Sequence, residues 1–191
     1  MVAICAFVLT ATAAVDGIST ITPTQLTCEY DADPVIDIQN PRFTWVNQNT
    51  AKKQGAAQTA YRIRVATSPD DFSLTVWDTG KVHSSESAFI TYKGQPLKSR
   101  TSYWWQVMVW DESGSASAWS TPASWHMGLD EDQWQGEWIG APWQGEESYD
   151  VVGSKDVLPS PLLRKEFTVR EGVESVRFYG TGLGYFELWC N

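Results

Sequence analysis

Short runs of alternating apolar and polar residues, separated by clusters of Pro, Gly, Asn, Asp and Ser, follow one another along most of the chain. This two-residue period is typical of β-strands with one buried face, and no segment of convincing length has the period of a helix. Seven short strands with turn signals between them predict a β-sandwich. The predicted strands are Thr24–Tyr30, Arg42–Val46, Thr59–Thr67, Leu74–Asp78, Ser87–Tyr92, Ser102–Asp111 and Ala118–Met127.

The longest predicted strand carries a signature of its own. Leu97, Thr101 and Tyr103 precede a run of alternating apolar residues, which resembles the fibronectin type III pattern. In that pattern a tyrosine corner places the ring in the core, while its hydroxyl bonds to backbone just upstream. We expect Trp45, on the second strand, to be the partner across the two sheets. The residues expected in the core are Trp45, Tyr61, Tyr103, Trp105 and Val107.

The other face of the same strand is also apolar, with Trp104, Met108 and Trp110. The outer face of a solvated antiparallel sheet is normally polar, so we expect this face to be covered. The cover expected first is a second domain or another part of a parent protein. A sugar-stacking platform, to which Trp143 would also contribute, and simple partial exposure are the two alternatives.

The alternation stops after residue 128 and returns near the end of the chain. We therefore expect an all-β chain, with a fibronectin type III or immunoglobulin-like seven-stranded sandwich over 22–128 and a boundary loop over 129–161. The first strands of an incomplete, jelly-roll-like second sandwich are expected over 162–191. The strands expected in that last piece are Leu163–Val169, Val173–Gly180 and Tyr185–Cys190.

The first fourteen residues, Met1–Ala14, are apolar and contain an A-x-A sequence at Ala11–Ala13. This is the form of a signal-peptidase site, although the usual basic n-region is missing. The stretch is shorter than the ~20 residues that a membrane span needs. We expect a signal peptide and a secreted or periplasmic protein, with a buried first strand as the alternative.

The net charge and the cysteines limit the partners and sites that this chain can have. A net charge of −9 repels phosphate backbones, which excludes nucleic acid as a partner. Of the three cysteines, Cys5 lies in the apolar leader, and Cys28 and Cys190 fit neither a disulfide framework nor a metal site, so we expect two unpaired thiols.

Candidate catalytic groups are few. His83 and His126 have no metal-ligand spacing, and we expect both at the surface or rim of the fold. The acidic residues of the boundary loop are solvated, whereas catalytic carboxylates need burial or a coupled neighbour to shift their pKa values. They are Glu146, Glu147, Asp150 and Asp156. We expect no catalytic residue, no metal and no cofactor in this chain.

Taken in order, the motifs of residues 24–191 resemble the N-terminal region of the bacterial α-L-rhamnosidases of glycoside hydrolase family 78. The motifs are LTCEY at 26–30, NPRFTW at 40–45, QTAYRIRV at 58–65, WDTGKV at 77–82, LKSRTSYWW at 97–105, VWDE at 109–112, SAWS at 117–120, WIG at 138–140, LRKEF at 163–167 and GLGYFEL at 182–188.

The resemblance implies a parent enzyme that releases terminal L-rhamnose from glycosides and polysaccharides by inversion, with two carboxyl groups in an (α/α)6 barrel. In that family both carboxyl groups lie downstream of the GLGYFEL segment, so no residue here inherits a catalytic role. The resemblance also implies that the chain stops inside its second domain, and that its partners are the downstream domains of the parent.

Three functions remain open from the sequence. The chain is a structural module that docks against a rhamnosidase catalytic domain, a carbohydrate-binding module with exposed Trp, or an adhesion-type fibronectin domain unrelated to enzymes. The ordered motifs favour the first.

Overall fold

A computed structural model describes residues 19–140, 161–174, 176–183 and 185–190. The chain divides into two compact units, Met1–Asp130 and Glu131–Asn191, which are treated separately below. The signal peptide expected at Met1–Ala14, Trp143 and the acidic residues of 146–156 lie outside the described residues.

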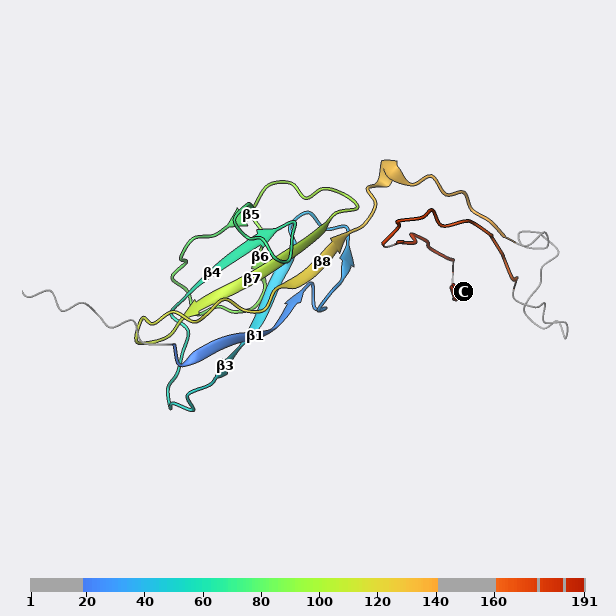
Figure 1. Ribbon diagram of the computed structural model, residues 1–191. Helices are drawn as coiled ribbons and strands as arrows, with labels where there is room; N and C mark the ends of the chain where they lie inside the picture. Colours follow the sequence, from blue (N-terminus) through green and yellow to red (C-terminus); the bar gives the residue numbers. More distant parts are fainter. Residues whose placement is uncertain (1–18, 141–160, 175, 184, 191) are drawn as a thin grey trace, which may run out of the picture. The chain divides into compact units, whose positions relative to one another are not determined.

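The first unit is a sandwich of two β-sheets (Figure 1). The three-stranded sheet has the order β1 (Ile21–Cys28), β3 (Arg42–Asn49) and β6 (Ile90–Thr91). The five-stranded sheet has the order β2 (Val35–Ile36), β8 (Ala123–Met127), β7 (Ser102–Trp110), β4 (Ala60–Ala66) and β5 (Thr75–Asp78). All neighbours are antiparallel except β2 and β8, which are parallel. The prediction of an all-β, immunoglobulin-like sandwich is confirmed.

The two-residue period of the sequence becomes the two faces of each sheet. In β4, Tyr61, Ile63 and Val65 are buried, while Arg62 and Arg64 between them are half-buried on the outer face. Burying the inward row stabilises the fold by roughly 1.5–3 kcal/mol for each large apolar side chain. All the side chains expected in the core from the sequence lie there: Trp45, Tyr61, Tyr103, Trp105 and Val107.

Aromatic pairs connect the two sheets across the core. Trp45 packs edge-on against Tyr61, with 5.4 Å between the ring centres. The ring across from Trp105 is Phe43, at 4.5 Å, a residue that the alternation pattern does not single out. Tyr103 stacks within its own sheet on Trp125 at 5.2 Å. The core is therefore mainly aromatic, and offset or edge-on pairs of this kind add about 0.5–1.5 kcal/mol each beyond their burial.

The buried side-chain amide of Gln58 hydrogen-bonds to polar groups at the edge of this core. The side-chain oxygen of Gln58 accepts hydrogen bonds from Trp45 Nε1 at 3.1 Å and from Asn47 Nδ2 at 2.9 Å. Its side-chain nitrogen donates to the backbone oxygens of Ser84 and Glu86 at 3.0 and 2.8 Å. The buried N–H of Trp45 thus has its hydrogen-bond partner in Gln58.

Several strand boundaries differ from the prediction. β2 was not predicted, because two residues with Val35 exposed leave no alternation to detect. β8 begins at Ala123 rather than Ala118, since Ser117 and Ser120 bond to β7 with their hydroxyls as well as their amides. Each hydroxyl takes the place of a strand carbonyl, and this competition with ladder hydrogen bonds interrupts the strand.

The second unit has little regular structure among its described residues. Glu131–Gln133 forms one short 3-10 helix, and the described part of 161–190 contains no strand. The three strands expected there do not appear among the described residues. A strand is stable where its backbone pairs with a neighbour and one face is buried. Here the apolar side chains are exposed, Leu183 at 90% and Trp189 at 86% among them.

Candidate interface on the outer face of the five-stranded sheet

The outer face of the five-stranded sheet carries the residues that the sequence singled out for contact. Trp104, Met108 and Trp110 alternate with the core residues of β7, and all three are half-buried. On β4, Met108 lies opposite Arg62, and Trp110 lies opposite Ala60. The predicted interface residues that the structure describes thus form one row on one face.

A charged cluster lies beside this row. Arg62 Nε and Nη2 donate to the two carboxylate oxygens of Asp78 at 2.8 and 2.7 Å, and Arg64 Nε lies 3.4 Å from the same carboxylate. The hydrogen bonds from Arg62 lower the pKa of the Asp78 carboxyl, although partial burial works against them. Two positive charges therefore share one ionised partner, which leaves the cluster with a surplus positive charge.

Trp119 covers that surplus charge from the irregular segment between β7 and β8. Its ring centre is 4.4 Å from the guanidinium carbon of Arg64 and 5.9 Å from that of Arg62. At the other end of the row, Lys81 Nζ lies 4.5 Å from the ring centre of Trp110. The outer face is thus covered in part by side chains of the same sandwich, a solution that the sequence analysis did not include.

Sequence reasoning missed Trp119 as a residue of this face. It lies in the SAWS motif, but no period-two pattern assigns an irregular segment to a face. The signal that could have found it is the pair of arginines on the polar positions of β4, because guanidinium groups stack on Trp rings.

Ser102, His126 and Asp33 contact one another at the same sheet. These are the three residue types of a serine catalytic triad, so we compared their geometry with that of a triad. Ser102 Oγ and His126 Nδ1 are 2.7 Å apart, and His126 Nε2 is 3.1 Å from an Asp33 oxygen. A serine triad needs an accessible nucleophile beside oxyanion donors and a buried Asp that orients the His. Ser102 instead lies in a regular strand opposite His126, and the side chain of Asp33 is 59% exposed. We interpret this Ser–His–Asp chain as a cross-strand polar contact, in which the His126 side chain is 16% exposed.

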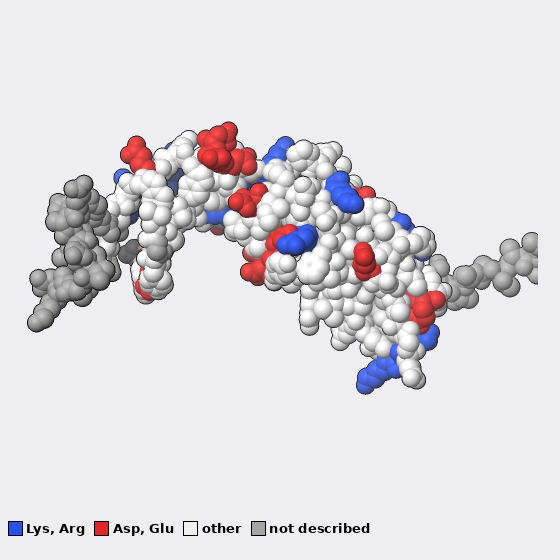
Figure 2. Space-filling view, turned by 180° about the vertical axis from the view of Figure 1, so that it is seen from behind, with Lys and Arg blue, Asp and Glu red and all other residues white. Residues whose placement is uncertain are grey.

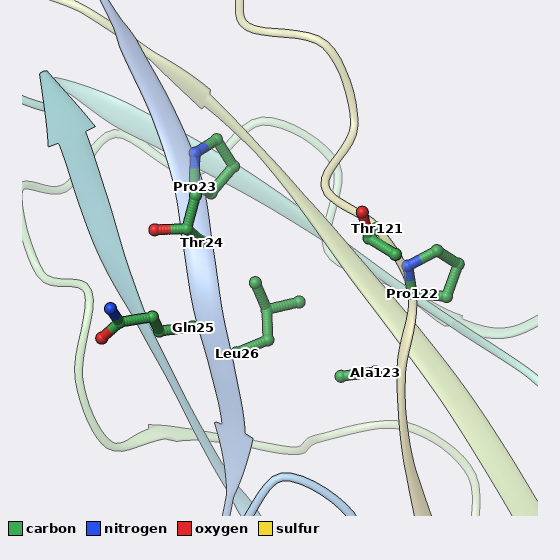
Figure 3. A pocket seen from close by; sticks show the side chains of 7 residues that line it. All are labelled: Pro23, Thr24, Gln25, Leu26, Thr121, Pro122 and Ala123. Atoms are coloured by element: carbon green, nitrogen blue, oxygen red, sulfur yellow. The ribbon is translucent and has the colours of Figure 1, made fainter. Parts of the chain in front are cut away.

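A shallow groove opens between β1 and the segment that leads into β8 (Figure 3). Leu26 lies between the two backbones, whereas the Gln25 side chain points to the other side of β1 (Figure 3). Gln25 has φ of 50° at the irregularity between Thr24 and Thr27, where the pairing of β1 with β3 shifts register. The lining of the groove contains no ionisable side chain, so the groove provides no acid or base. The lining residues are Pro23, Thr24, Gln25, Leu26, Thr121, Pro122 and Ala123.

Among the described residues, charge and metal chemistry add no further site. On the face seen in Figure 2, Lys and Arg side chains of the sandwich are scattered rather than gathered into a stripe. The described residues include no group of three or more His, Cys, Asp or Glu that could hold a metal ion. Both described cysteines are free, Cys28 buried and Cys190 exposed. Within the part of the chain that the structure describes, no helix has the length and apolar character to cross a membrane.

Comparison with known protein families matches residues 23–131 to a domain described as "Rha78A-like, N-terminal immunoglobulin domain". A protein of Streptomyces avermitilis named alpha-L-rhamnosidase is 42% identical over 139 residues, which cover 71% of this chain and 13% of that protein. One of the same name from Formosa agariphila is 35% identical over 172 residues, covering 82% of this chain and 18% of its own length.

Solved structures show the same likeness. The structure of Streptomyces avermitilis alpha-L-rhamnosidase complexed with L-rhamnose matches with a TM-score of 0.60 and 42% identity, over 64% of this chain and 12% of that one. The alpha-L-rhamnosidase of Dictyoglumus thermophilum matches with a TM-score of 0.57 and 33% identity, over 63% and 14%. The chain spans less than a fifth of the length of these relatives.

Proposed function

The chain belongs to the family of the Rha78A-like, N-terminal immunoglobulin domain, and from this premise we propose that it is the non-catalytic N-terminal module of an exported α-L-rhamnosidase. The parent enzyme would release terminal L-rhamnose from glycosides or polysaccharides. The observation that carries this proposal is that the match over 23–131 coincides with nearly all of the described sandwich. The resemblance to glycoside hydrolase family 78 that the motifs indicate is confirmed.

The ionised groups of the sandwich support a structural role rather than a catalytic one. An inverting glycosidase needs a general acid whose pKa is raised, facing a second carboxylate across the substrate. Here hydrogen bonds from Arg42 lower the pKa of Glu29, and hydrogen bonds from Lys53 lower that of Glu112. The pKa of Asp78 is lowered in the same way. These carboxylates are held as anions by the fold, which is the wrong state for a proton donor.

The outer face of the five-stranded sheet is the surface that we propose for docking, and its occupant is a neighbouring domain of the same polypeptide. Trp, Met and Arg are the residues that contact surfaces use most, and they lie together here around Trp104, Met108 and Trp119. The rings are half-buried under their own neighbours, which favours a flat protein contact over a free platform for sugar. Relatives that are about five times as long provide such a neighbour.

A domain exchange in the Streptomyces avermitilis relative tests the structural role. Deleting its matching N-terminal domain should lower the melting temperature of that enzyme, and inserting residues 19–130 of this chain in its place should restore it. The chain alone should not hydrolyse a chromogenic α-L-rhamnoside. Trp104→Ala in the inserted domain should reduce the restoration, while Leu74→Ala, at an exposed site, serves as the control. Equal stability of the deleted and intact enzymes would reject the structural role, and turnover by the chain alone would reject the non-catalytic one.

A further inference from the structure

The hairpin turn between β1 and Asp31 has an unusual composition. Cys28 and Asp31 exchange backbone hydrogen bonds of 2.8 and 3.1 Å, and the two residues between them, Glu29 and Tyr30, have φ of 46° and 75°. A two-residue turn with both φ values positive is a type I′ turn, for which Asn-Gly is preferred. The left-handed region is unfavourable for Glu and Tyr, so both side chains are present although the backbone conformation disfavours them.

A second aromatic residue in the same strained conformation lies beside the first. Phe89 has φ of 57°, and its ring centre is 5.7 Å from that of Tyr30 at an interplanar angle of 62°. Tyr30 is 70% exposed and Phe89 is 54% exposed. We name these two rings the Tyr30–Phe89 corner. Two large rings held open to solvent by strained backbone indicate a use outside the core, because a structural role would bury them.

An ion pair between Arg42 and Glu29 packs against both rings of this corner. The guanidinium carbon of Arg42 lies 5.2 Å from the Tyr30 ring centre and 5.6 Å from that of Phe89. Glu29 accepts hydrogen bonds from Arg42 Nη2 at 2.6 Å and from the Arg42 backbone amide at 2.7 Å. The charge of Arg42 is thus compensated, and the corner presents aromatic faces and polar hydrogen atoms without a net charge.

The size and charge of the corner decide between ligand classes. Two aromatic side chains offer roughly 300–500 Å² in all, whereas a stable protein interface needs about 800 Å² on each partner. An anion would find the Arg42 charge already neutralised by Glu29. A pyranose ring has an apolar C–H face for stacking and hydroxyl groups that hydrogen-bond to Arg and Thr side chains. Thr44, whose hydroxyl accepts the Phe89 amide at 3.1 Å, provides such a group next to the rings.

We propose that Tyr30, Phe89 and Arg42 form a weak binding site for a neutral pyranoside on the three-stranded sheet, the face opposite to the proposed docking surface. The sugar stacks on the solvent-exposed surface of the two rings, and Arg42 contacts its hydroxyls. This proposal rests on the geometry of the sandwich and not on the docking role, so either can fail without the other.

The test is an NMR titration of the whole chain with methyl α-L-rhamnopyranoside and methyl α-D-glucopyranoside, following the backbone amides of Tyr30 and Phe89. Mannitol and sodium sulfate serve as the acyclic and the anionic control. We expect saturable shifts at millimolar concentration with at least one pyranoside and none with the two controls. Absence of saturation with both pyranosides, or saturation with sulfate, would overturn the proposal.

Two variants separate binding from folding. Tyr30→Asn and Phe89→Asn remove the rings and place a residue that accepts the left-handed conformation. Each should weaken pyranoside binding by at least about tenfold while the melting temperature stays equal or rises. Leu74→Ala, at an exposed position just before β5, should leave binding unchanged. If the Asn variants lower the melting temperature and keep the affinity, the rings are structural and the site is rejected.

Discussion

The hydroxyl oxygen of Tyr103 accepts a hydrogen bond of 2.8 Å from the backbone amide of Lys98, five residues upstream. The ring is buried and stacks on Trp125, so the residue joins the start of β7 to the loop before it. This is the tyrosine corner that the order of Leu97, Thr101 and Tyr103 predicts. It makes the loop before β7 part of the core rather than a free connection.

Tyr103→Phe should lower the free energy of unfolding by about 1–3 kcal/mol, because the Lys98 amide loses its acceptor while the packing is kept. Urea denaturation followed by Trp fluorescence measures this. Tyr92→Phe is the matched control, since the Tyr92 hydroxyl donates at 2.8 Å to the backbone carbonyl of Gln95, an exposed residue. A loss no larger than in the control would show that the corner is not a stabilising contact.

The sequence predicts best where one periodic signal acts alone. β7 matches its predicted range to within one residue, because its alternation continues over nine residues. Prediction from the sequence fails where the stability of an element comes from partners that are distant in the chain. β2 exists only through its pairing with β8, and Trp119 takes its place through the arginines of β4. The alternation in 163–190 predicts strands, but alternation describes one face of a sheet and does not provide its partner.

Trp119→Ala should lower the free energy of unfolding by about 1–2 kcal/mol, because Arg64 and Arg62 lose the ring that covers their surplus charge. Trp119→Phe should recover part of this loss, since a smaller ring still attracts a cation. Thermal unfolding of the three proteins at one salt concentration gives the comparison. If Trp119→Ala and Trp119→Phe unfold at the wild-type temperature, the ring is not what stabilises the outer face.

Cys28 should be unreactive in the native protein. Burial, together with the nearby Glu29 charge, raises the pKa of its thiol to about 12, so almost no thiolate exists at neutral pH. In a Cys5→Ser variant, a thiol reagent at pH 8 should modify the exposed Cys190 at once and Cys28 only after denaturant is added. Rapid modification of two thiols under native conditions would contradict the buried position of Cys28.

Asp111 should make the sandwich sensitive to acid. It is fully buried, which by itself raises the pKa of its carboxyl, but hydrogen bonds from Ser113, Thr20 and Ser115 outweigh the burial. The pKa therefore lies well below its ordinary value of 3.8. The carboxylate accepts the Thr20 amide at 2.8 Å and the Ser113 hydroxyl at 2.6 Å, so it connects the residue before β1 to the turn after β7.

Since the folded-state pKa is depressed, the stabilisation by Asp111 is complete above pH 3.8. It is lost as the pH falls further toward the folded-state pKa, because the unfolded chain takes up a proton first.

Asp111→Asn should cost about 2–3 kcal/mol at pH 7. Because Asn cannot titrate, this difference from the wild type should shrink below pH 3.8. Urea unfolding between pH 7 and pH 2 measures both effects, with Asp70→Asn, in an exposed loop, as the control for the loss of one charge. Equal losses in the two variants at pH 7 would mean that the buried hydrogen bonds of Asp111 do not hold the ends of β1 and β7 together.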